Sequence, residues 1–88
     1  MNRERLKELT SAERIREDSY SLEGGLPSEK YVLAAVEGGW AVYYSERGER
    51  TGLEVVETED EACSRLFELL VQDATTRQNY PRGTGPGS

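Results

Sequence analysis

Histidine is absent from this chain of 88 residues. Without it no Ser–His or Cys–His nucleophile pair can form, and no imidazole can bind a metal ion or carry protons near neutral pH. Any catalysis would depend on carboxylates, lysine, tyrosine or arginine, which disfavours ordinary enzymatic chemistry. We therefore expect a protein that is not an enzyme and that holds neither a cofactor nor a metal ion.

Cysteine occurs once, at Cys63, which excludes an internal disulfide and any metal site built from several cysteines. Long apolar runs are also missing, so no segment approaches the length that crosses a bilayer. The N-terminal stretch MNRERLKEL lacks the apolar block of a secretory signal. These absences predict a single small domain in the cytoplasm, with no membrane association.

Basic residues are few: 11 lysines and arginines stand against 17 acids, for a formal net charge of −6. The acids end at Asp73, and Arg77 and Arg82 follow. A body this acidic repels phosphate backbones and disfavours nucleic acid as a partner, whereas it would attract a basic protein such as a nuclease domain. Composition alone favours a simpler explanation, that the excess of acidic residues keeps a small protein soluble.

The first half of the chain predicts a short helix and then a loop. Residues 2–10, NRERLKELT, place Leu6 and Leu9 one helical turn apart among good helix formers. Residues 18–29, DSYSLEGGLPSE, contain glycines and a proline that forbid a regular element. The apolar residues in this stretch indicate a loop that is laid over the domain.

Three stretches predict an antiparallel meander: KYVLAAVE, WAVYYSER and TGLEVVE. Gly38-Gly39 suits a tight hairpin turn of the primed type, and Gly48-Glu49 suits a second turn. In this register one face is the predicted core, and a one-residue slip would exchange the faces of the third strand. That face carries Tyr31, Leu33, Trp40, Val42, Tyr44, Leu53 and Val55.

The clearest local pattern is a C-terminal helix. Thr58-Glu59-Asp60-Glu61 fits a capping box, and Cys63, Leu66, Phe67 and Leu70 follow on one helical face, so the helix should end near Gln72 or Asp73. Residues 74–88 are rich in glycine, proline and threonine and predict a disordered tail. The expected architecture is a two-layer α+β domain over residues 1–73: an N-terminal helix, a three-stranded antiparallel meander, and a C-terminal helix packed on one sheet face.

The residues that could carry chemistry have simpler explanations. Ser45 and Glu46 are neighbours on a strand, so their side chains diverge and cannot act together. Cys63 lies near a helix N-terminus, where a thiol pKa can fall. It also lies on the apolar stripe beside two acids, which favours a buried structural cysteine. The run EGGLP lacks the lysine and hydroxyl ending of a phosphate loop and is best explained as a turn.

Aromatic residues are concentrated in the strands and the preceding loop. Trp and Tyr are frequent at the energetic centres of protein interfaces, and a core this small cannot bury five of them comfortably. In the register above we expect Tyr43 to be exposed on the uncovered sheet face. The candidate partner-binding residues on the strands and beside them are Tyr43, Glu46, Arg47, Glu49, Glu54 and Glu57.

Three stretches, YSLEGGLPSEKYVL, WAVYYSERGERTGL and ETEDEACSRLFELL, resemble a family of small bacterial proteins similar to the immunity proteins encoded beside secreted polymorphic toxins. The resemblance covers about residues 15–72, and it carries over no catalytic residue. It implies a cytoplasmic protein that neutralises a cognate toxin by binding it. The distinctive pieces are Tyr20-Ser21-Leu22, Gly25-Leu26-Pro27, Tyr43-Tyr44-Ser45-Glu46-Arg47-Gly48 and Thr58-Glu59-Asp60-Glu61-Ala62-Cys63.

Two hypotheses follow, from different classes of protein. The first is an immunity protein that occludes the active face of a basic toxin domain, such as a nuclease, through its sheet and adjoining loops. The alternative is a non-catalytic structural or regulatory interaction module, homodimeric through sheet edges or exposed faces. An enzyme that uses carboxylates and tyrosine ranks below both.

Overall fold

The computed structural model describes residues 1–78. Two α-helices and a four-stranded mixed sheet form an α+β fold, which confirms the predicted class. In chain order the elements are α1 (Arg3–Ala12), the 3₁₀ helix η1 (Glu17–Ser19), β1 (Tyr20–Ser21), β2 (Lys30–Val36), β3 (Gly39–Glu46), β4 (Glu49–Val56), α2 (Glu59–Gln72) and the 3₁₀ helix η2 (Ala74–Thr76).

The sheet has the strand order β1-β2-β3-β4, one strand more than the predicted meander. Strand β1 pairs in parallel with β2, with Tyr20 opposite Tyr31 and Ser21 opposite Val32. The other neighbouring strands are antiparallel, as predicted. A two-residue strand is too short to leave an alternating pattern, so the sequence alone predicts only a loop there.

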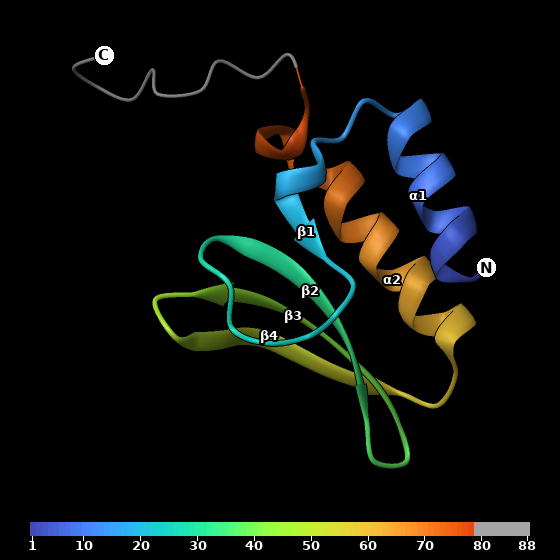
Figure 1. The fold of residues 1–88 in the computed structure, drawn as a ribbon, viewed down its shortest axis with the longest axis vertical. Coiled ribbons are helices and arrows are strands. Elements are labelled where there is room, and N and C mark those ends of the chain that lie inside the picture. The colour runs from blue at the N-terminus through green and yellow to red at the C-terminus, as the bar shows by residue number, and fades with distance from the viewer. Residues whose placement is uncertain (79–88) are drawn as a thin grey trace.

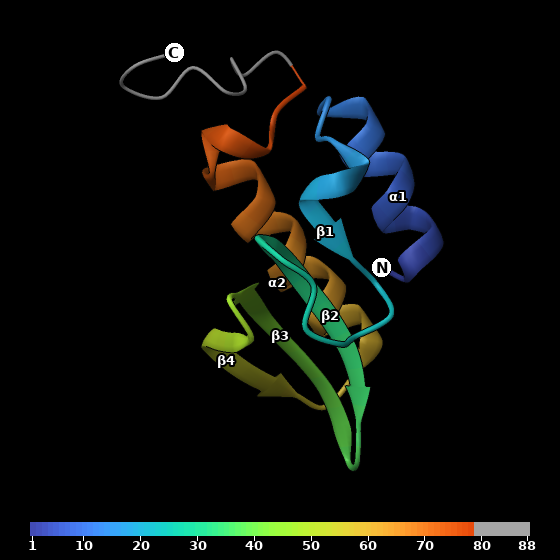
Figure 2. The ribbon, with the colours of Figure 1, turned by 60° about the vertical axis from the view of Figure 1, so that its left-hand side comes forward.

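The sheet lies between helix and loop. Helix α2 packs against one face of the sheet and α1 lies beside α2 (Figure 1). The loop of residues 22–29 crosses the other side of the sheet, in front of β2 in Figure 2. This confirms that the loop is laid over the domain. The main core between sheet and helices consists of Leu6, Ile15, Leu33, Val42, Ala62, Cys63, Leu66 and Leu70.

The turn between β2 and β3 differs from the prediction by one residue. Val36 pairs with Gly39, so the turn residues are Glu37 and Gly38, and Gly38 has a φ of +80°. Gly39 is required for a different reason: a Cβ there would lie 2.3 Å from the carbonyl oxygen of Val56. The pairing of β2 with β3 is therefore shifted by two positions, which leaves each residue on its predicted face because side chains alternate with a period of two.

The register of β4 is shifted by one residue, and its faces are exchanged. Val42 lies opposite Glu54, and the pairing is irregular between Val42 and Tyr44. The predicted core residues Leu53 and Val55 are instead 53% and 62% exposed. Two causes combine: the turn begins one residue earlier than predicted, and a bulge beside Gly52, whose φ is +66°, adds a residue to β4.

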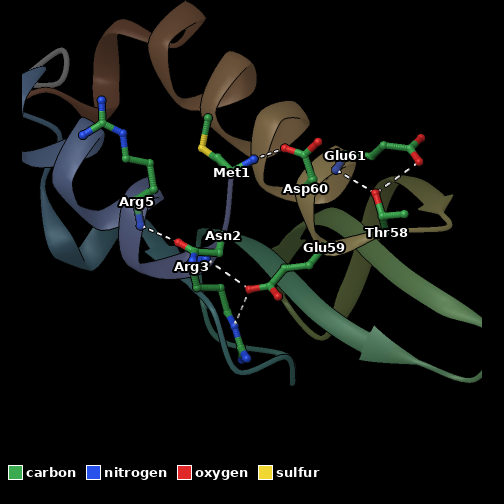
Figure 3. A network of polar contacts seen from close by, with 8 residues as sticks. All are labelled: Met1, Asn2, Arg3, Arg5, Thr58, Glu59, Asp60 and Glu61. Carbon is green, nitrogen blue, oxygen red and sulfur yellow. Dashed lines mark hydrogen bonds and ion pairs between the residues drawn. The ribbon is translucent and has the colours of Figure 1, made fainter.

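Helix α2 begins as the capping box predicts. The hydroxyl of Thr58 accepts a hydrogen bond from the backbone amide of Glu61 at 3.1 Å and donates one to the Glu61 carboxylate at 3.2 Å (Figure 3). Helix α1 begins in the same way, because the side chain of Asn2 accepts from the amide of Arg5 at 2.8 Å. Helix α1 continues to Ala12, two residues beyond the predicted end.

Polar contacts tie the N-termini of the two helices together (Figure 3). The α-ammonium group of Met1 pairs with Asp60. The guanidinium Nε of Arg3 donates to the Glu59 carboxylate at 3.1 Å. Carboxylates near a helix N-terminus interact favourably with the positive end of its dipole. Glu59 and Asp60 therefore stabilise the start of α2 and hold α1 against it.

The chain remains part of the fold after α2, where the sequence predicts a disordered tail. Thr76 is buried, and its hydroxyl donates to the carbonyl of Leu70 at 2.7 Å. The carbonyl of Thr76 accepts from the amide of Arg16 at 2.8 Å. The prediction is therefore wrong for residues 74–78, and residues 79–88 of the predicted tail lie outside the described part of the chain. Hydrogen bonds to a segment 60 residues earlier leave no periodic signal.

Candidate binding surface

The groups considered for catalysis are occupied in structural roles. Ser45 is fully buried and its hydroxyl donates to the carbonyl of Pro27 at 2.6 Å. Cys63 is buried in the core, where burial and the nearby Glu59 carboxylate raise the pKa of its thiol. Within residues 1–78 no three acidic or cysteine side chains are grouped to hold a metal ion. Neither Ser45 nor Cys63 is therefore placed as an activated nucleophile.

A tyrosine and carboxylate cluster joins the sheet to the end of α2. The Tyr31 hydroxyl donates to the Asp73 carboxylate at 2.9 Å. The rings of Tyr31 and Tyr44 pack edge to face, with their centres 4.9 Å apart. Burial, the hydrogen bond to Asp73 and the charge of Asp73 raise the pKa of Tyr31 to about 12. Burial works against the ionised form of Asp73, but hydrogen bonds from Thr75 and Tyr31 outweigh it and lower the Asp73 pKa. Because the Tyr31 phenol stays protonated near neutral pH, it keeps its hydrogen bond to Asp73, and we assign it a structural role.

This cluster predicts a loss of stability at alkaline pH. The folded-state pKa of Tyr31 lies above its ordinary value of 10.0. Its contribution to stability is therefore complete below pH 10.0 and is lost as the pH rises toward about 12. We expect Tyr31→Phe to flatten the fall in the urea unfolding midpoint over this range. An equally steep fall in the variant would show that Tyr31 does not cause it.

Tyr43, expected to be exposed, is 3% accessible. Its hydroxyl donates to the carbonyl of Gly25 in the loop of residues 22–29 at 2.6 Å. The guanidinium of Arg50 lies 5.2 Å from the centre of the Tyr43 ring, within range of a cation–π interaction. Tyr43 therefore anchors the loop to the sheet, and the expectation of an exposed aromatic side chain here is wrong.

The other predicted partner residues fall in three places. Glu54 faces α2 and forms an ion pair with Arg65 at 2.8 Å, so it belongs to the helical side. Glu57 is exposed just after β4. The remaining three, Glu46, Arg47 and Glu49, come together at the β3–β4 turn.

The β3–β4 turn combines locally unfavourable features. Glu46 lies directly opposite Glu49 in the sheet, and like charges in this arrangement destabilise a strand pair. Arg47 and Gly48 both have positive φ, +51° and +78°, as a two-residue type I′ turn requires. Glycine and asparagine suit such a position better than arginine. Within residues 1–78 neither glutamate forms an ion pair that would offset the repulsion.

A groove on the loop side of the sheet holds exposed apolar side chains. Its floor is formed by Ala34, Ala41 and Tyr43, and Leu53 and Val55 of β4 line it. Its volume is about 720 Å³. The sequence reasoning missed this surface because it placed Leu53 and Val55 in the core. Gly52 was the available signal, since an isolated glycine within a strand indicates a bulge.

Comparison with known proteins shows no relationship. No protein-family model, curated protein or solved structure matches the chain significantly. Neither helix in residues 1–78 is long and apolar enough to cross a membrane. Functional inference therefore depends on the two surfaces described above, the β3–β4 turn and the apolar groove.

Proposed function

We propose that this protein is a cytoplasmic immunity protein that binds and neutralises a cognate toxin domain, and that the β3–β4 turn contacts the toxin. The observation that carries the proposal is the pairing of Glu46 with Glu49 beside Arg47 in a left-handed conformation. Proteins depart from local preferences most often at functional sites. A basic partner would relieve the repulsion between the two carboxylates.

The distribution of ion pairs supports a basic partner. Seven acids form ion pairs within residues 1–78, whereas Glu46, Glu49 and Glu57 form none, as is also true of Glu4, Glu17 and Glu61 on the helices. Uncompensated charge of one sign steers an oppositely charged partner and speeds its association. The compensated acids are Glu8, Glu13, Asp18, Glu54, Glu59, Asp60 and Glu68.

The shape of the hairpin supports the same role. The paired strands on both sides of the turn fix its position, and β4 forms one edge of the sheet (Figure 2). A binding group held on a paired hairpin loses little conformational entropy when a partner docks. Arg47, exposed at the tip, would add a contact of opposite sign and so favour one docking orientation.

Co-expression with the toxin domain encoded beside this protein tests the proposal. We expect the two chains to co-purify, the host cell to be protected, and the affinity to fall as salt rises, because the contact is electrostatic. The double variant E46Q/E49Q should lower the affinity by about 10-fold at low salt, since exposed charge pairs each contribute a fraction of a kcal/mol up to about 1 kcal/mol.

The matched control is E4Q/E17Q, which removes the same charge from exposed glutamates outside the sheet. It should leave the affinity within about 2-fold of the original value, because a distant exposed charge is largely screened. Equal effects of the two double variants would refute a role for the turn. Failure of the unmodified protein both to co-purify and to protect would refute the immunity function itself.

A further inference from the structure

The groove keeps exposed apolar side chains along its edge, beside the loop of residues 22–29 that crosses the same side of the sheet. Val36, Leu53 and Val55 are 41%, 53% and 62% exposed, and all three line the same groove. Small side chains, Ala34 and Ala41, form the floor beside them. A contiguous exposed apolar surface on a protein of this size marks an interaction site.

Four charged residues line the groove, Arg3, Glu23, Glu37 and Arg50, and the last two carry opposite signs at its two ends. Glu37 lies at the β2–β3 turn, and Arg50 lies opposite Ser45, near the β3–β4 turn. Ser45 lies six positions after Gly39 along β3, which at the rise of a strand corresponds to about 20 Å. A partner of uniform charge would meet a like charge at one of these ends, and such a contact is unfavourable.

A second copy of the same chain can dock so that neither Glu37 nor Arg50 faces a like charge. In a two-fold symmetric interface the same patch faces itself in the opposite direction. Arg50 of one protomer then faces Glu37 of its partner, and the contact is repeated by symmetry. The ridge of Leu53 and Val55 on each protomer is placed to enter the shallow alanine floor of the other.

We propose that the chain forms a two-fold symmetric homodimer in which the loop-side faces of the two sheets pack together. Leu53 and Val55 form the apolar centre of the interface, and two Glu37–Arg50 pairs close its ends. The apolar centre of this surface is separate from Glu46 and Glu49, although Arg50 adjoins Glu49, and the dimer can be measured without any toxin.

Sedimentation equilibrium over a wide range of concentration tests the dimer. The apparent mass should rise from 9.9 kDa toward twice that value. Leu53→Glu should raise the dimer dissociation constant by about 30-fold or more, as expected for a central apolar anchor. Ala12→Glu is the control, because Ala12 is exposed on α1 and does not line the groove, and it should leave the constant unchanged.

A charge reversal tests the geometry. Glu37→Arg and Arg50→Glu should each weaken the dimer, and the double variant E37R/R50E should restore it, with circular dichroism confirming that each variant folds. A wild-type protein that stays monomeric at the highest concentration would overturn the proposal. So would a dimer that Leu53→Glu does not affect, or single reversals that weaken it without rescue by the double variant.

Discussion

Gly39→Ala is expected to be among the most destabilising single substitutions in this protein, with a loss of about 3 kcal/mol in the free energy of unfolding. The added Cβ would lie 2.3 Å from the carbonyl oxygen of Val56 and 3.3 Å from its carbonyl carbon. Both atoms belong to the backbone, so no side chain can turn aside. Strands β3 and β4 would have to separate where Trp40 pairs with Val56.

Urea unfolding followed by circular dichroism measures this effect, and Gly38→Ala is the control. Gly38 has a φ of +80°, but an added Cβ there would meet no atom within 4 Å. Its substitution should cost only about 1 kcal/mol, from the left-handed backbone alone. If Gly38→Ala were as destabilising as Gly39→Ala, the conformation of the turn would explain the loss of stability. The close approach of Gly39 to Val56 would then not be its cause.

Thr76→Val should also cost about 3 kcal/mol, because it removes one hydroxyl that donates to two carbonyl groups. The Thr76 hydroxyl donates to Leu70 at 2.7 Å and to Asp73 at 2.8 Å. Valine has nearly the same shape, so packing is preserved while the Leu70 carbonyl loses the hydroxyl donor; the Asp73 carbonyl still accepts from the Thr76 amide at 3.1 Å. The prediction also tests whether residues 74–78 belong to the cooperative fold.

The neighbouring residue supplies the control. Thr75 is exposed, and its hydroxyl donates to the Asp73 carboxylate at 2.6 Å. Water can replace that bond, so Thr75→Val should cost about 0.5 kcal/mol. The ratio of the two effects is measured by urea unfolding under identical conditions. A Thr76 variant as stable as the Thr75 variant would mean that the segment after α2 contributes little to the stability of the domain.

Helix α2 and the central strands were predictable because their signals are local. Thr58 and Glu61 lie within one helical turn, so the capping box forms wherever the helix is placed. Leu33 and Val42 keep their buried face although the β2–β3 turn shifts by one residue, because a shift of two in the pairing preserves the alternation.

The candidate site was only partly predictable. Glu46, Arg47 and Glu49 come together because they surround a single turn, and a turn is a local feature. Tyr43 and Glu54 could not be placed correctly, since the position of Tyr43 depends on the loop that covers it and that of Glu54 on a bulge in its own strand. Leu53 and Val55 moved to the surface through the same bulge, which made them the centre of the apolar groove.

The sequence by itself determined the α+β class, the start and end of α2, the sides of β2 and β3 that face the helices, and the absence of histidine chemistry. These depend on periodicity and capping between residues a few positions apart. Only the tertiary structure decided the register of β4, the pairing of β1, the burial of Tyr43 and the docking of residues 74–78. Each of these depends either on hydrogen bonds and packing between segments distant in the chain or on one extra residue in a strand. Such features leave no repeating pattern in the sequence.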